Sequence, residues 1–142
     1  MKTGIAILVV SESSLKLSLT IAEHLPGSNL YSSFESIFTD TIPSIATFLK
    51  EHFNRFEAFV FVGSLGICVR SIAPFITDKH TDPAIVNIDS TGKFIVSVLS
   101  GHIGGANSLT KQIARIAGGQ AVITTQSDNT DLWALDTLGK TY

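Results

Sequence analysis

The sequence is poor in cysteine, in basic charge and in long apolar runs, and each shortage excludes a class of protein. One cysteine, Cys68, among 142 residues rules out a disulfide within the chain and is typical of a reducing compartment. Ten Lys and Arg against twelve Asp and Glu give a net charge of −2, without the basic excess typical of nucleic-acid binding. No stretch approaches the roughly 20 apolar residues of a membrane span. We therefore expect a cytoplasmic protein that binds neither nucleic acid nor membrane.

Motifs for metal, nucleotide and serine-hydrolase chemistry are also missing. Four scattered histidines and one cysteine show no metal-ligand spacing, so no metal site is predicted. The turn at residues 63–66 lacks the third glycine of a dinucleotide fingerprint, and no Gly-Lys-Ser/Thr follows it. No Gly-x-Ser-x-Gly elbow marks a serine nucleophile.

Apolar segments with strand and helix patterns alternate along the chain. Continuous aliphatic and β-branched runs predict buried strands, and apolar residues at helical spacing predict the helices between them. The predicted order is β-α-β-α-β-α-β-β-α-β, with strands at residues 5–10, 29–33, 57–62, 84–88, 94–99 and 121–124. The short Gly-bearing connection at 89–93 predicts a β-hairpin. The order predicts an α/β fold, a three-layer α-β-α sandwich with a mostly parallel sheet and one inserted antiparallel hairpin.

A glycine-rich corner follows the strand at 94–99 and leads into a helix. Three glycines, Gly101, Gly104 and Gly105, surround His102 there. Glycines at a helix start lower its stability by roughly 1 kcal/mol each relative to alanine, and close approach of a ligand to the backbone explains such a loss. The unpaired N–H groups of a helix start favour anions. His102 is the candidate general base, with helix capping as its alternative.

A second corner, with Gly63 and Gly66, follows the strand at 57–62. Ligands of parallel sheets bind beyond the carboxyl ends of the strands. We therefore expect both corners at that edge, forming one hollow with His102 exposed inside it. The alternative is that these glycines serve only backbone angles that side chains forbid.

Three further residues with reactive or charged side chains are interpreted from their neighbours in the sequence. Arg70, on the helix after Gly66, suits a bidentate carboxylate contact, or else a salt bridge to Asp78 or Asp82. Cys68 lies between apolar residues and is interpreted as core packing. His80, in a polar stretch, is interpreted as a solvated surface residue, with a role in the site as its alternative.

Four stretches resemble, in matching order, the motifs of the CbiG family, the cobalt-precorrin-5A hydrolases of anaerobic cobalamin biosynthesis. They are residues 66–74, 78–86, 100–107 and 124–128. The most specific is Ser100-Gly101-His102-Ile103-Gly104-Gly105-Ala106-Asn107. The stretch at 124–128 departs from the family in carrying Gln126-Ser127 where relatives have a smaller Ala-Thr pair.

The resemblance implies a reaction and a set of site residues. Water opens the δ-lactone of cobalt-precorrin-5A, acetaldehyde leaves, and cobalt-precorrin-5B results. The cobalt arrives inside the substrate, so no separate cofactor is expected. His102 is assigned as the base. The residues assigned to substrate binding are Gly63, Gly66, Arg70, Lys79, Asp82, Gly101, Gly104, Gly105 and Asn107.

The resemblance also implies a larger protein. We expect an N-terminal α/β domain at 1–125 and the start of a linker or central region at 126–142. Another cobalamin-biosynthesis enzyme, such as a fused methyltransferase, is the partner implied. Two other hypotheses stay open. One is a non-catalytic tetrapyrrole-binding or docking module of a larger protein, and the weaker one is a phosphate- or nucleotide-binding domain.

Overall fold

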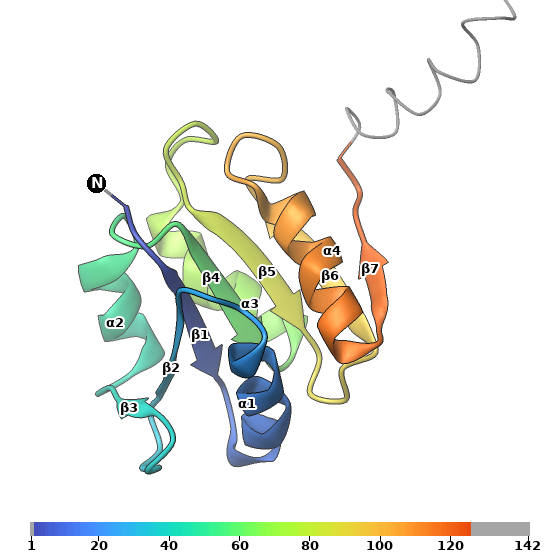
Figure 1. The fold of residues 1–142 in the computed structure, drawn as a ribbon. Helices are drawn as coiled ribbons and strands as arrows, with labels where there is room; N and C mark the ends of the chain where they lie inside the picture. The colour runs from blue at the N-terminus through green and yellow to red at the C-terminus, as the bar shows by residue number, and fades with distance from the viewer. Residues whose placement is uncertain (1, 126–142) are drawn as a thin grey trace, which may run out of the picture.

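The computed structural model describes residues 2–125; the stretch 126–142, expected to begin a linker, lies outside this part. The strands are β1 (Ile5–Val9), β2 (Ser28–Ser32), β3 (Asp40–Thr41), β4 (Ala58–Val62), β5 (Ala84–Ile88), β6 (Phe94–Leu99) and β7 (Gln120–Val122). The helices are α1 (Leu15–Glu23), α2 (Ile45–His52), α3 (Leu65–Ile72) and α4 (Ala106–Ala117), with short 3-10 turns η1 (Glu12–Ser14) and η2 (Ala73–Phe75). Together they form one sheet with helices on both faces (Figure 1).

The direction of the strands decides which loops meet. The sheet order is β3-β2-β1-β4-β5-β6-β7, and β1 to β5 all run parallel. β6 turns back antiparallel to β5, and β7 runs parallel to β6. The ends of β6 and β7 therefore lie where β1, β4 and β5 begin. We call that side of the sheet the amino edge, and the opposite side, where the five parallel strands end, the carboxyl edge.

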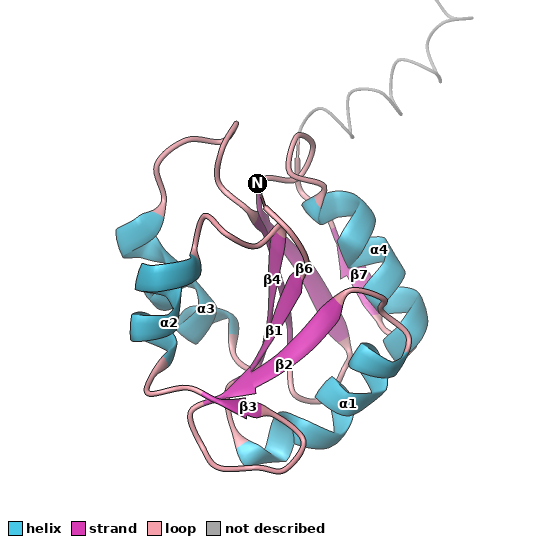
Figure 2. Ribbon diagram, turned by 60° about the vertical axis from the view of Figure 1, so that its left-hand side comes forward, coloured by secondary structure: helices cyan, strands magenta, loops and turns pink. Residues whose placement is uncertain are grey.

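Two apolar clusters fill the space between the three layers. α1 and α4 cover one face of the sheet, and α2 and α3 cover the other (Figure 2). Successive β1 residues alternate between them, because Ile7 packs toward α1 and α4 whereas Leu8 packs toward α2 and α3. β1, β4 and β5 are buried on both faces, which explains their apolar sequences. The exception is the buried Asn87 in β5, whose side-chain amide donates to the Gly63 carbonyl. The predicted three-layer sandwich with one antiparallel pair is confirmed.

Helix ends follow local rules. Ser64 begins α3, and its Oγ accepts a hydrogen bond from the Ile67 N–H. α4 is instead flanked by glycines in the left-handed region, Gly105 at φ 87° and Gly118 at φ 72°. Side chains rarely adopt this conformation, so the backbone requires glycine at both ends of α4.

Candidate functional site

The two glycine corners lie at opposite edges of the sheet, so the shared hollow predicted from the sequence is wrong. Gly63 lies at the carboxyl edge, where its N–H donates to the Ile88 carbonyl at the end of β5. Gly104 lies at the amino edge, where an added Cβ would be 3.5 Å from the Ala84 nitrogen at the start of β5. The reason is the hairpin. Because β6 runs antiparallel to β5, the turn after β6 lies where β5 begins.

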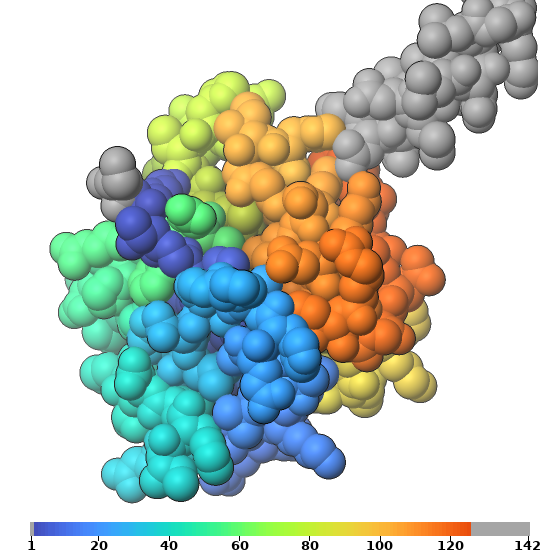
Figure 3. Space-filling model, viewed as in Figure 1, coloured from blue at the N-terminus to red at the C-terminus, as the bar shows by residue number. Residues whose placement is uncertain are grey.

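Two loops meet at the amino edge instead. One is the 76–83 loop, which leads into β5, and the other is the 100–105 loop between β6 and α4. They lie side by side at the top of Figure 1, and their atoms adjoin on the surface in Figure 3. The Ser100 hydroxyl donates to the Asp82 carbonyl at 3.1 Å, which joins the two loops directly.

Asp82 organises the 76–83 loop from within. Its side chain is buried, and its carboxylate accepts hydrogen bonds from the Thr77 N–H and hydroxyl and from the Asp78 N–H. The expected substrate contact would have to displace these bonds, so we assign Asp82 a positioning role. Nor does it pair with Arg70, which is exposed on α3 and forms no ion pair within residues 2–125.

Packing and backbone angles account for the glycines of the 100–105 loop. A Cβ on Gly101 would lie 2.7 Å from the Asn107 Oδ1, and one on Gly104 would lie 2.5 Å from the Ser100 Cβ. Gly105 has a left-handed φ of 87°. Close approach of a ligand is therefore not needed to explain them, contrary to the argument from the sequence.

The two glycines of the corner at the carboxyl edge differ in the space that an added Cβ would find. A Cβ on Gly63 would lie 2.9 Å from the Val10 Cβ, so packing of β4 against the end of β1 requires this glycine. Gly66 lies in the first turn of α3 with open space around it. No contact or backbone angle among the described residues requires a glycine at Gly66.

Asn107 connects the 100–105 loop to its surroundings. This buried side chain accepts from the Ser97 hydroxyl at 2.6 Å and donates to the Thr125 hydroxyl at 2.9 Å. Its backbone N–H donates to the Gly101 carbonyl at 3.0 Å. Asn107 thus holds β6, the loop and the residues after β7 together, and we assign it a positioning role.

The start of α4 offers fewer free donors than the sequence suggested. The N–H groups of Ala106 and Asn107 donate to the Ser100 and Gly101 carbonyls. Within residues 2–125, the N–H groups of Gly104 and Gly105 have no acceptor. Together with the Ser108 N–H, which has no acceptor there either, they are the donors that remain for an anion at this helix start.

A groove runs along the amino edge in two adjoining hollows, of about 440 Å³ and about 260 Å³. The first lies between the loops and is lined by Lys2, Glu57, His80, Thr81 and Gly104, among others. The second continues along α4 and is lined by Glu57, Gly104, Gly105, Ser108 and Gln112, among others. Glu57 and Gly104 border both. We call the two hollows together the amino-edge groove.

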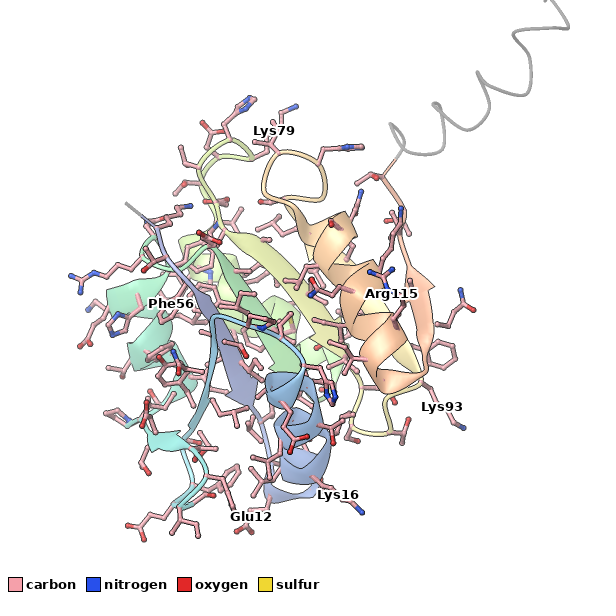
Figure 4. All side chains as sticks on the ribbon, viewed as in Figure 1. Glu12, Lys16, Phe56, Lys79, Lys93 and Arg115 are labelled. Carbon is pink, nitrogen blue, oxygen red and sulfur yellow. The ribbon has the colours of Figure 1, made fainter. Side chains whose placement is uncertain are left out.

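Basic side chains gather at the end of the groove formed by the 76–83 loop. The Lys2 ammonium donates to the Thr81 carbonyl, which holds the N-terminal segment against this loop. Exposed His80 lines the groove, and Lys79 extends from the top of the loop (Figure 4). His102 is exposed on the neighbouring loop, as expected, but lines neither hollow.

The residues predicted from the sequence thus divide between two places. Those at the amino edge are Lys79, Asp82, Gly101, His102, Gly104, Gly105 and Asn107, whereas Gly63 and Gly66 lie at the carboxyl edge. Arg70 lies apart from both groups, in the last turn of α3. The sequence analysis missed Lys2 and Glu57. Their positions in the sequence could have indicated them. Each precedes a strand that runs parallel to β5, and the starts of parallel strands lie at the same edge of the sheet.

Cys68 packs in the core, as predicted. It is fully buried under α3, and burial raises the pKa of its thiol to about 12. The reactive thiolate is therefore absent near neutral pH, and a nucleophilic role is disfavoured.

Residues 2–125 contain neither a cluster of metal ligands nor a membrane-spanning helix. No group of three or more His, Cys, Asp or Glu side chains there is placed to hold a metal ion. No helix in this part of the chain has the length and apolarity to cross a membrane.

Comparison with known proteins identifies the family. Residues 47–128, more than half of the chain, match the family described as Cobalamin synthesis G N-terminal. The chain belongs to this CbiG N-terminal family. The resemblance described from the sequence is thereby confirmed.

Relatives within the CbiG family are much longer than this chain. The cobalt-precorrin-5A hydrolase of Salmonella typhimurium is 47% identical over 89 residues, which cover 63% of this chain and 25% of the relative. That of Priestia megaterium is 44% identical over 99 residues, covering 70% of this chain and 26% of the relative. The chain thus spans about a quarter of the length of these curated relatives.

A solved structure in the CbiG family has the same fold. The cobalamin biosynthesis protein G homolog from Sulfolobus solfataricus superposes with a TM-score of 0.69 at 26% identity. The match covers 85% of this chain and 36% of that one.

Three of the four family motif stretches meet at the amino edge, whereas the stretch at 66–74 lies on α3 and η2. Residues 78–83 and 100–107 form the two loops of the amino edge, and Thr125 bonds to Asn107 beside them. Three motif stretches that are separate in the sequence are therefore neighbours.

Proposed function

We propose that this chain is part of a cobalt-precorrin-5A hydrolase and that its amino-edge groove binds the tetrapyrrole. The observation that carries this proposal is the convergence of the 76–83 and 100–105 loops on one groove, with the Ser100 to Asp82 bond between them. The names of relatives at 44% to 47% identity support the choice of reaction.

The proposed reaction sets three requirements. Water must add to the lactone carbonyl, so a proton acceptor is needed. The oxyanion that forms needs hydrogen-bond donors. The acetate and propionate groups of the macrocycle need cations or N–H groups to bind them. Opening of the lactone and release of acetaldehyde then give cobalt-precorrin-5B, with the cobalt carried throughout by the substrate.

The amino-edge groove offers groups for each requirement. Lys2 and His80 line the end of the groove, and Lys79 lies above it on the same loop, so this end suits carboxylates. The N–H groups of Gly104 and Gly105 suit an oxyanion or another carboxylate. His102, exposed on the 100–105 loop, remains a candidate proton acceptor for a substrate that extends beyond the groove.

Docking to another enzyme of cobalamin biosynthesis, such as a methyltransferase, belongs to the same proposal. Leu65, Ile67 and Val69 are exposed on α3 and supply an apolar surface for it. A cytoplasmic location is also proposed, in keeping with a single cysteine that forms no disulfide.

The test is to measure cobalt-precorrin-5A binding and acetaldehyde release by this chain beside a full-length relative. We expect binding that weakens at least tenfold in Lys79→Glu, because the change reverses a charge at the rim of the groove. Lys16→Glu makes the same change on α1 at the far end of the molecule (Figure 4) and serves as the control. Absence of binding, or equal losses in the two variants, would refute the groove as the site. Binding without acetaldehyde release would indicate a tetrapyrrole-binding module.

A further inference from the structure

Glu57 occupies the junction between the two hollows of the amino-edge groove. Its backbone is held on both sides, since its N–H donates to the Gly4 carbonyl and its carbonyl accepts from the Ala84 N–H, each at 3.0 Å. These bonds fix the residue between the segments that lead into β1 and β5. The exposed side chain therefore starts from a rigid position beside the groove.

The acidic side chains near the groove differ in whether they already accept hydrogen bonds within the chain. Asp82 is satisfied inside its own loop, and Asp78 accepts from the His80 N–H at 2.9 Å. The Glu57 carboxylate has no hydrogen bond or ion pair to any group in residues 2–125. Glu57 is thus a carboxylate with accepting capacity left at the groove.

Amide donors border the same space. Gly104 lines both hollows and Gly105 lines the second, and neither N–H has an acceptor within the described part of the chain. Glu57 and these two amide donors therefore border the same two-part groove. Addition of water to a carbonyl requires both kinds of group, a proton acceptor and oxyanion donors.

We propose that Glu57 is the catalytic residue that activates water for opening of the lactone, with the Gly104 and Gly105 N–H groups binding the oxyanion. This assignment rests on the function proposed above. It places the base on the segment before β4, whereas the sequence had placed it at His102.

The step balances within the site. Glu57 takes one proton from water while the water oxygen forms a bond to the lactone carbonyl carbon, and the carbonyl π electrons move onto its oxygen. The oxyanion then collapses, the ring C–O bond breaks, and the leaving alkoxide takes the proton back from Glu57. The products are a carboxylic acid and an alcohol, and Glu57 is regenerated as a carboxylate.

The decisive variant is Glu57→Gln, which keeps the shape and exposure of the side chain and removes its basicity. We expect substrate binding within about threefold of the unmodified chain and kcat lower by roughly 10²- to 10⁴-fold, the usual contribution of a general base. Glu57→Asp should restore part of kcat. The control is Glu12→Gln, at the far end of the molecule (Figure 4), which should change neither quantity. Unchanged turnover in Glu57→Gln beside an active unmodified chain refutes the assignment and leaves the proposed function intact.

The other outcomes of the same experiment also decide. Binding of cobalt-precorrin-5A without acetaldehyde release by the unmodified chain refutes Glu57 as a catalytic residue of this chain and leaves the groove as a binding site. No binding by the unmodified chain refutes the proposed function itself, and the assignment with it.

Discussion

Ser100 and Asp82 are 18 residues apart in the chain and are joined by a 3.1 Å hydrogen bond from the serine hydroxyl to the aspartate carbonyl. Ser100 makes this bond with a backbone φ of 60°, in the left-handed region that non-glycine residues rarely adopt. The bond and the unusual conformation together set how the 100–105 loop meets the 76–83 loop, and therefore the shape of the groove between them.

Two substitutions at Ser100 should separate the hydrogen bond from the backbone strain. Ser100→Ala removes the bond and keeps the strain, so we expect a loss of about 1 kcal/mol in the free energy of unfolding. Ser100→Gly removes both, and relief of roughly 1 kcal/mol of strain should bring its stability close to that of the unmodified chain. Urea denaturation followed by circular dichroism measures the difference. Equal destabilisation by the two variants would contradict a strained serine.

Alanine substitutions at two glycines should have effects of opposite sign. Gly104→Ala places a Cβ 2.5 Å from the Ser100 Cβ and 2.9 Å from its carbonyl oxygen, so we expect a loss of about 1–3 kcal/mol from overpacking. Gly66→Ala adds a Cβ into open space on α3 and should stabilise the domain by up to about 1 kcal/mol. The melting temperatures of the two variants test this matched pair. A stabilising Gly104→Ala would contradict the packing described for the 100–105 loop.

The order of strands and helices was predictable from the sequence because each element carries its own periodic pattern. The hairpin strands were predicted at 84–88 and 94–99 and are observed there. β3, Asp40–Thr41, was missed because two residues are too few to show any periodicity. β7 was predicted at 121–124 and lies at Gln120–Val122, a shift typical for element ends.

The candidate site was predicted less well, although the sequence held the necessary clue. A hairpin at 89–93 reverses the chain, so the turn at Gly101 could not share an edge with the turn at Gly63. The position of Glu57 at the groove and the hydrogen bond from Thr77 to the Asp82 carboxylate could not be predicted from the sequence, because both depend on how the loops lie in three dimensions.

Asp82→Asn should loosen the 76–83 loop selectively. The amide has one acceptor oxygen in place of two, so part of the bonding from Thr77 and Asp78 is lost. We expect a loss of about 1–3 kcal/mol in the free energy of unfolding. Amide hydrogen exchange should quicken in the 76–83 loop while β1 and β4 stay protected. Uniform acceleration across the sheet would instead indicate that Asp82 supports the whole fold.

Asp89 should make the hairpin sensitive to acid. Partial burial raises the pKa of its carboxyl, but hydrogen bonds from the Thr91 hydroxyl and from the Phe94 and Thr91 N–H groups outweigh burial and leave the pKa below its ordinary value. A carboxyl whose pKa is lower in the folded state contributes stability above its unfolded pKa of about 3.9, and that contribution disappears as the pH falls through the folded pKa. Asp89→Asn should therefore be less stable than the unmodified chain at pH 7, and the difference should shrink as the pH falls through the folded pKa. Urea denaturation at pH 7, 5, 4 and 3 measures both curves. A stability difference that stays constant from pH 7 to pH 3 would show that the Asp89 charge contributes nothing to the hairpin.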